Sequence, residues 1–181
     1  MWPFARRRPR YAPDRPFPAY AHQPGQTPHP FREEGGHSYG EEEPEAPPLD
    51  PDRPGDSEMY RHGFDLLNHG YLWEAHTAWE ALWHAAGREG DVADLLKALI
   101  RISAAGVKAR QGMNGGVKSH LAAASELLRG IAARTGRPTM AGIRLEDLAV
   151  HCDGVVEGTP PHGPHPDLEG NRWAWVLRPD L

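Results

Sequence analysis

The sequence has a single cysteine, no long apolar run and no excess of positive charge, and each absence excludes a class of protein. Because Cys152 stands alone, an internal disulfide is excluded, which fits a reducing compartment. Nowhere do about 18 apolar residues follow one another, and no apolar stretch of signal-peptide length follows the first arginines. The net charge of -5 argues against a nucleic-acid partner, because such partners select a basic surface. We therefore predict a cytoplasmic protein without a membrane segment.

Residues 1–56 also have few of the side chains that build a core. They hold 13 of the 19 prolines and almost no leucine, isoleucine or valine. A basic block is followed by an acidic one, and the basic block begins with Arg6, Arg7, Arg8 and Arg10. This composition predicts a disordered tail, and it favours a solvated tail over an arm that docks on a partner. The predicted organisation is a disordered tail over 1–56, a helical domain over 57–158 and an irregular C-terminal tail over 159–181.

From residue 57 onward, apolar residues recur at helical spacing. The pattern predicts five helices, at about 57–69, 71–86, 91–110, 117–135 and 145–157. Cys152 lies on the apolar stripe of the last one, which predicts a buried, unreactive thiol. No segment alternates at period two for long enough to form a strand. The predicted fold class is all-α, a compact bundle of about five mostly antiparallel helices joined by short loops.

The stretch GYLWEAHTAWEALWHAAG, residues 70–87, gathers polar and aromatic side chains on one predicted helix. Four of them share a face, because they fall at i, i+3, i+4 and i+7: His76, Trp79, Glu80 and Trp83. His76 and Glu80 lie in the apolar register, where a carboxylate is costly unless a cation pairs with it. The next helix offers two candidate partners, Lys97 and Arg101, and of these Arg101 suits a bidentate contact with Glu80, with His76 completing the network.

Three interpretations of this cluster stay open. It is a buried polar network that fixes how two helices meet, a small-ligand site with aromatic walls, or a metal or acid–base centre. For the last of these, His76 and Glu80 are the candidate catalytic residues. Zinc requires three or four protein ligands, and no His-Glu-x-x-His motif is present, so we predict neither metal nor cofactor. The candidate binding residues are Tyr71, Trp79, Trp83, Lys97 and Arg101.

The stretch FDLLNHGYLWEAHTAWEALWHAAG resembles the signature of the bacterial domain of unknown function family 309. The matching positions within it are Phe64, Asn68, Gly70, Tyr71, Glu74, Ala75, His76, Glu80 and Trp83, and KALIR, Lys97 to Arg101, resembles the family's next block. The resemblance covers about residues 58–157. Thr77 and Met113 depart from the family's pattern. Met113 stands where the family usually has a loop asparagine, and Asn114 lies one place further along. The resemblance implies a helical bundle and carries no established activity.

These features predict a small-ligand or protein-interaction module centred between the second and third helices, rather than an enzyme. The alternative is a small hydrolase or metal-binding protein that uses Glu80 as general base and His76 as its partner or as a ligand. A further alternative is a nucleic-acid-associated factor that binds through the N-terminal arginines and a stripe of Lys97, Arg101 and Lys108.

Overall fold

The computed structural model describes residues 8–157 and 176–181, and it contains five α-helices within them. They are α1 (Glu58–Asn68), α2 (Leu72–Ala85), α3 (Asp91–Arg110), α4 (Asn114–Thr135) and α5 (Leu145–Val156). A short 3-10 helix, Pro54–Asp56, precedes α1. The predicted all-α bundle is confirmed. The fourth helix begins three residues before the predicted start, because it includes the two glycines that follow Asn114.

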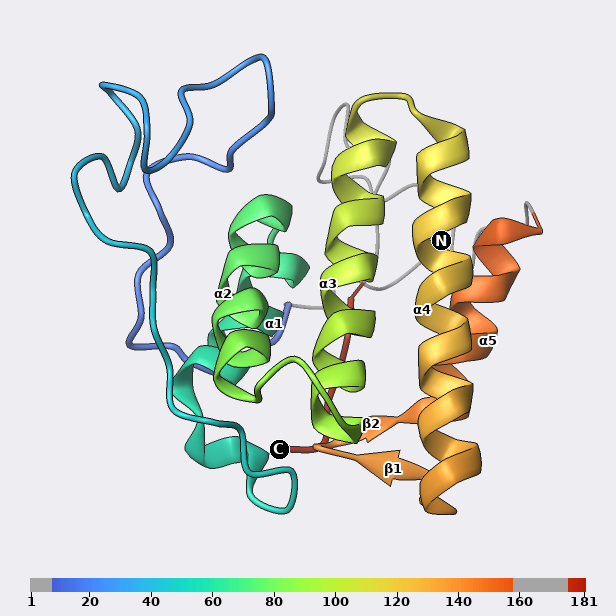
Figure 1. Cartoon of the computed structure of the whole chain (residues 1–181). Coiled ribbons are helices and arrows are strands. Elements are labelled where there is room, and N and C mark those ends of the chain that lie inside the picture. The colour runs from blue at the N-terminus through green and yellow to red at the C-terminus, as the bar shows by residue number, and fades with distance from the viewer. Residues whose placement is uncertain (1–7, 158–175) are drawn as a thin grey trace, which may run out of the picture.

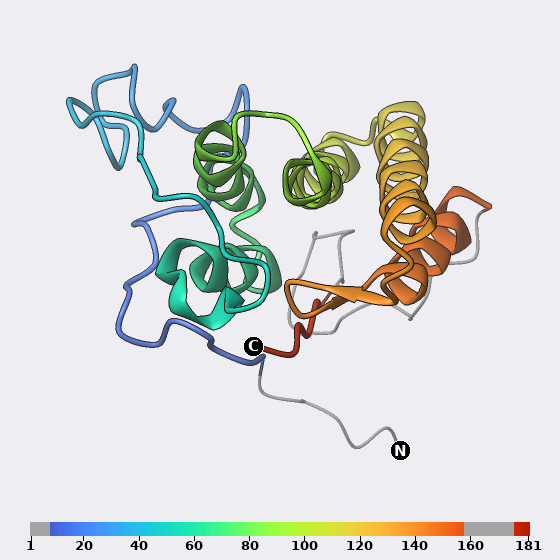
Figure 2. The ribbon, with the colours of Figure 1, turned by 60° about the horizontal axis from the view of Figure 1, so that its bottom comes forward.

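Each helix packs against the next one along the chain, with α3 between α2 and α4 (Figures 1 and 2). Local signals set the helix ends. Ser57 caps α1 by accepting a hydrogen bond from the backbone N–H of Tyr60 at 3.2 Å. At the far end of α4, Gly136 adopts the left-handed conformation that closes many helices, with φ of 66°.

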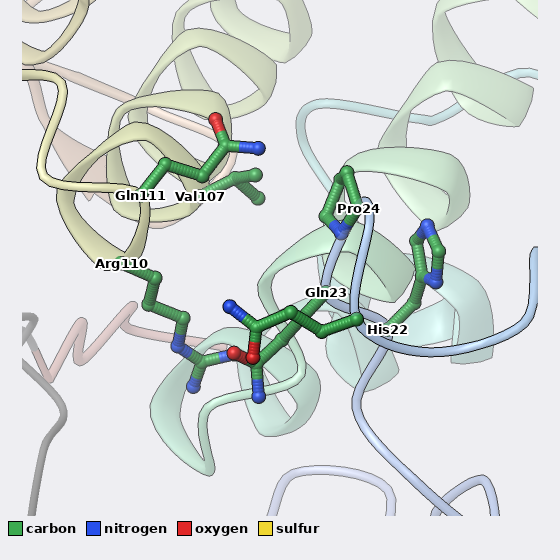
Figure 3. Close-up of a pocket in the computed structure, with 7 residues that line it drawn as sticks. His22, Gln23, Pro24, Val107, Arg110 and Gln111 are labelled. Atoms are coloured by element: carbon green, nitrogen blue, oxygen red, sulfur yellow. The ribbon is translucent and has the colours of Figure 1, made fainter.

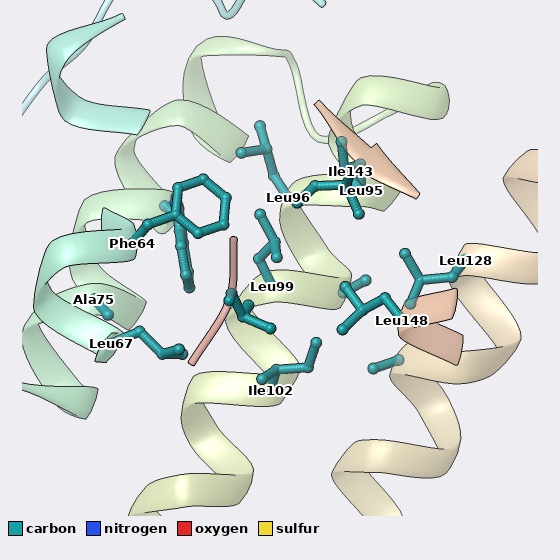
Figure 4. Packing of buried hydrophobic residues seen from close by; sticks show 14 of the residues in the cluster. Phe64, Leu67, Ala75, Leu95, Leu96, Leu99, Ile102, Leu128, Ile143 and Leu148 are labelled. Carbon is teal, nitrogen blue, oxygen red and sulfur yellow. The ribbon is translucent and has the colours of Figure 1, made fainter. Parts of the chain in front are cut away.

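The core forms around α3. Figure 4 shows Leu99 and Ile102 of this helix between Phe64 and Leu67 of α1 on one side and Leu128 of α4 on the other. All five of these side chains are buried. Cys152 is also buried, and burial raises the pKa of its thiol to about 12, which makes it unreactive at neutral pH.

A small hairpin joins α4 to α5. Strands β1 (Thr139–Met140) and β2 (Ile143–Arg144) pair antiparallel, with Met140 opposite Ile143. The two turn residues, Ala141 and Gly142, both have positive φ, as a two-residue hairpin turn requires. Strands of two residues are too short to show the alternation of apolar and polar residues that predicts a strand.

Within the described residues 8–53 there is neither α-helix nor strand, and this segment runs along α1 and α2 (Figures 1 and 2). We call residues 8–49 the N-terminal arm. Ala12, His22 and Leu49 of the arm are buried, at 3%, 5% and 5% exposure. Arg6, Arg7 and most of the predicted C-terminal tail lie outside the described residues, and the predicted domain boundaries stay a prediction. No helix among the described residues is long and apolar enough to cross a membrane.

Candidate functional site

The predicted pair on α2 lies at the edge of the buried face rather than within it. His76 Nε2 is 3.8 Å from Glu80 Oε2, and the two side chains are 33% and 45% exposed. The buried face of α2 is instead formed by Leu72, Ala75 and Trp79, with further small and apolar residues. The expectation of a carboxylate inside the apolar core was therefore wrong, because helical spacing does not fix how wide the buried face is.

Arg101 contacts a different partner from the predicted one. Among the described residues, its guanidinium Nη1 donates to His120 Nδ1 of α4 at 3.3 Å, not to Glu80. Burial lowers the pKa of His76, the charge of Glu80 partly reverses this, and Arg101 lowers the pKa further. Burial also lowers the pKa of His120, helped by Arg101, Lys108 and His76. The structure thus brings His76, Glu80, Arg101 and His120 together.

The predicted aromatic walls do not surround this group. Trp79 is fully buried and packs edge-to-face on Phe64, with ring centroids 5.1 Å apart. Trp83 lies near the end of α2, where the guanidinium of Arg88 sits 5.4 Å from its ring centroid. Tyr71 stacks on Phe17 of the arm at 4.9 Å and 7°.

Lys97, the remaining predicted binding residue, is half-buried on α3, one turn before Arg101. The predicted binding residues therefore have different surroundings. Trp79 lies in the core, Trp83 at the end of α2 and Tyr71 at the contact with the arm, whereas Lys97 and Arg101 lie on α3.

Asp65, whose carboxylate accepts three hydrogen bonds, was not predicted as a site residue. Its side chain is fully buried on α1. Its two carboxylate oxygens accept hydrogen bonds from the backbone N–H groups of Tyr11 and Ala12, at 2.7 and 2.9 Å, and from Arg10 Nε at 3.0 Å. All three donors belong to the N-terminal arm. A residue of the helical domain thus binds the main chain of a distant segment.

Two further buried residues bind main chain in the same way. The side-chain amide of Asn68 donates to Leu177 O at 2.9 Å, and its oxygen accepts from Leu177 N at 2.8 Å. Glu74 Oε1 accepts from the backbone N–H of His22 at 2.6 Å and lies 3.2 Å from Nε2 of His37. In the sequence, Asn68 and Glu74 stood out only as positions that match the family signature. No sequence pattern indicated what they bind.

The arm also reaches the end of α3. A hollow of about 10 Å³, the size of one water molecule, lies between the arm and α3 (Figure 3). It is lined by His22, Gln23, Pro24, Gln26, Val107, Arg110 and Gln111. A larger hollow of about 340 Å³ lies between α5 with its hairpin and residues 176–180, and it contains none of the predicted site residues.

The described residues offer no group of three histidine, cysteine, aspartate or glutamate side chains placed to hold a metal ion. The site is therefore best described as two separate arrangements. One is the set of side chains that bind backbone groups of other segments, Asp65, Asn68 and Glu74. The other is the charged group around Arg101.

A family model described as "Domain of unknown function (DUF309)" matches residues 60–119. The matched segment contains α1, α2, α3 and the start of α4, and it includes Asp65, Asn68, Glu74, His76 and Arg101. No curated protein and no solved structure matches the chain.

Proposed function

Residues 60–119 belong to the family of unknown function DUF309, and we propose that this helical segment is a protein-interaction module that binds the main chain of a peptide segment. The observation that carries the proposal is Asp65. A fully buried carboxylate is costly to remove from water unless hydrogen bonds and a cation compensate for it. Here both kinds of compensation come from one short segment, Arg10 to Ala12.

The contacts explain which peptides such a site would select. The two consecutive backbone N–H groups that bind Asp65 lie in a bend at Tyr11 and Ala12, because consecutive N–H groups of an extended strand point to opposite sides. These bonds set no requirement on the side chains of the peptide. Arg10 adds a requirement for a cation before that stretch, and its guanidinium also lies 4.2 Å from the centroid of the Phe17 ring. Tyr11 packs edge-on against Phe64 with centroids 6.2 Å apart. The preferred ligand is a proline-rich segment that bends at this contact and has an arginine followed by an aromatic residue.

Asn68 and Glu74 support the same function. Together with Asp65 they put three buried polar side chains on α1 and α2, each bound to segments outside residues 60–119. The hydrolase alternative receives less support. Glu80 is 45% exposed, whereas a general base of raised pKa requires shelter from water.

The test supplies the arm as a separate peptide. In the full chain, Arg10→Ala removes the guanidinium donor to Asp65, and Ala12→Pro removes the backbone N–H donor. The variant with both substitutions therefore has a loosened arm. A labelled peptide of residues 8–23 should then bind saturably, as measured by fluorescence anisotropy. It should bind the unsubstituted chain at least about tenfold more weakly, because a tethered arm competes at millimolar effective concentration.

Asp65→Ala in the same background should abolish binding, and a peptide carrying Ala12→Pro is the matched control for the ligand. Thermal unfolding of each variant checks that the helices remain folded. Equal binding with and without Asp65, or no binding to the variant whose arm is loosened, would contradict the proposal.

A further inference from the structure

Arg101 differs in its partner from Arg129 and Arg134, the two arginines of α4. Arg129 contacts Glu146 at 3.1 Å and Asp153 at 2.7 Å. Arg134 likewise contacts two carboxylates, those of Asp91 and Asp94, at 2.8 and 2.6 Å. Among the described residues, no carboxylate lies within ion-pair distance of the Arg101 guanidinium, whose hydrogen-bond partner is the His120 ring at 3.3 Å.

Arg101 is half-buried as a residue, so water reaches its side chain only in part. Arginine stays protonated at all ordinary pH values, whereas the lowered pKa of His120 keeps that ring neutral near pH 7. A neutral imidazole accepts the hydrogen bond and supplies no negative charge. A half-buried cation with a neutral partner therefore remains able to bind an anion.

Three adjacent helices supply the surrounding groups, with α3 in the middle (Figures 1 and 2). His76 comes from α2 and His120 from α4, and His76 is near enough to His120 to lower the pKa of that ring. Because Arg101 donates to Nδ1 of His120, the remaining ring hydrogen of that histidine is on Nε2, where it is a further donor. Lys108 lies near enough to His120 to lower its pKa.

We propose that Arg101, His76 and His120 form a binding site for a small oxyanion, the phosphate or carboxylate group of a ligand. Guanidinium and imidazole N–H groups are the donors that such anions prefer, and Arg101 can bind one with two parallel hydrogen bonds. Two cations, Arg101 and Lys108, outweigh the single carboxylate of Glu80. This site is independent of the peptide site, because Glu74 and His76 are two residues apart and lie on different faces of α2.

The site should bind more tightly as the pH falls. A bound anion favours the protonated imidazoles, so it raises the pKa of His76 and His120 towards their ordinary range. The charged groups facing them are Glu80 on α2 and Arg101 and Lys108 on α3. Glu80 competes with an incoming anion, so Glu80→Gln should tighten binding by roughly two- to fivefold.

The experiment is an NMR titration of the full chain that follows the histidine ring signals. Inorganic phosphate is added at constant ionic strength in one series and acetate in another. His76 and His120 should shift saturably. The Arg88–His84 pair, with Arg88 Nε 3.0 Å from His84 Nδ1 on the exposed end of α2, is the internal control and should not shift. Saturation by phosphate alone identifies a phosphate-bearing ligand, and saturation by acetate alone identifies a carboxylate.

Arg101→Gln should weaken binding by about tenfold or more, as expected for loss of a charge-assisted pair. Arg88→Ala is the matched control and should leave the affinity unchanged. The proposal is overturned if neither anion shifts His76 and His120 saturably, if His84 shifts equally, or if Arg101→Gln retains the original affinity. The first two results are read from the unsubstituted chain, so they do not depend on how any variant folds.

Discussion

At the scale of single residues, Gly63 determines how closely α1 approaches α2. A Cβ atom at this position would lie 2.3 Å from Nε1 and 2.6 Å from Cε2 of Trp79. The Trp79 ring is fully buried and cannot move aside without disturbing Phe64, on which it packs. The absence of one methyl group at Gly63 is thus what allows a tryptophan into the core at this point.

Gly63→Ala should destabilise the fold by about 1–3 kcal/mol, because it overpacks a rigid contact. Gly130→Ala is the matched control, since Gly130 is also inside a helix but its nearest neighbour is Nη1 of Arg134, at 3.1 Å on a flexible side chain. That change should stabilise by roughly 0.5–1 kcal/mol, through the higher helix propensity of alanine. Chemical denaturation measures both, and a Gly63→Ala variant as stable as the original chain would refute the argument.

Sequence spacing correctly assigned Trp79 to the packing face of α2, but it could not separate that residue from Glu80, its neighbour. Trp79 lies inside the buried stripe of α2 and Glu80 lies at its edge. Where this stripe ends depends on the position of α3. Asp65 was missed for a different reason. It looks like a solvent-facing residue on an amphipathic helix, and it is buried because the arm, which has no periodic pattern, covers it.

At the scale of elements, all five helices were predictable because each has helical spacing and most end at a glycine. The hairpin was not, since its turn is Ala141-Gly142 rather than the Asn-Gly or Asp-Gly pair typical of such turns. Tertiary contacts hold it instead. Tyr60 of α1 donates a buried hydrogen bond from its hydroxyl to Ala141 O at 3.0 Å, and Asp180 N donates to Gly142 O at 2.9 Å.

Tyr60→Phe should therefore cost about 1–2 kcal/mol of unfolding free energy, because it leaves the buried carbonyl of Ala141 without its partner. Tyr39→Phe is the control, as Tyr39 is 56% exposed and its replacement should change stability by less than about 0.5 kcal/mol. Hydrogen exchange at the hairpin amides should accelerate only in the Tyr60 variant. Unchanged exchange there would mean that the hairpin is held by other contacts.

At the scale of the whole molecule, composition predicted a disordered tail over residues 1–56, and within it residues 8–53 have neither α-helix nor strand. It could not indicate that this segment contacts α1 and α2, because the contacts use main-chain groups, which every sequence has. Asp65 and Glu74 bind the arm, and Asn68 binds the C-terminal segment. The two ends of the described chain are thus joined to the same pair of helices, so the domain and its flanking segments should respond together to conditions that loosen either.

Acidification is such a condition, because the arm covers titratable groups. Burial lowers the pKa of His62 on α1 to about 4, helped by the charges of Arg15 and Arg10 in the arm, while Asp65 and Glu58 act in the opposite direction. The unfolded chain binds a proton at this residue near pH 6.5, but the folded chain does so only near pH 4. The stability that neutral His62 contributes is therefore complete above pH 6.5 and is lost as the pH falls towards 4.

The loss should reach about 3 kcal/mol by pH 4, as denaturation midpoints at stepped pH values would show. His22 and His69 have pKa values lowered mainly by burial and should add to the slope. His62→Phe keeps a ring beside Phe17, whose centroid is 6.3 Å away, and removes the titration. The variant should lose less stability than the original chain between pH 6.5 and 4. If both chains lose stability equally, the arm does not shelter His62, and its contacts with α1 open without cost to the helical core.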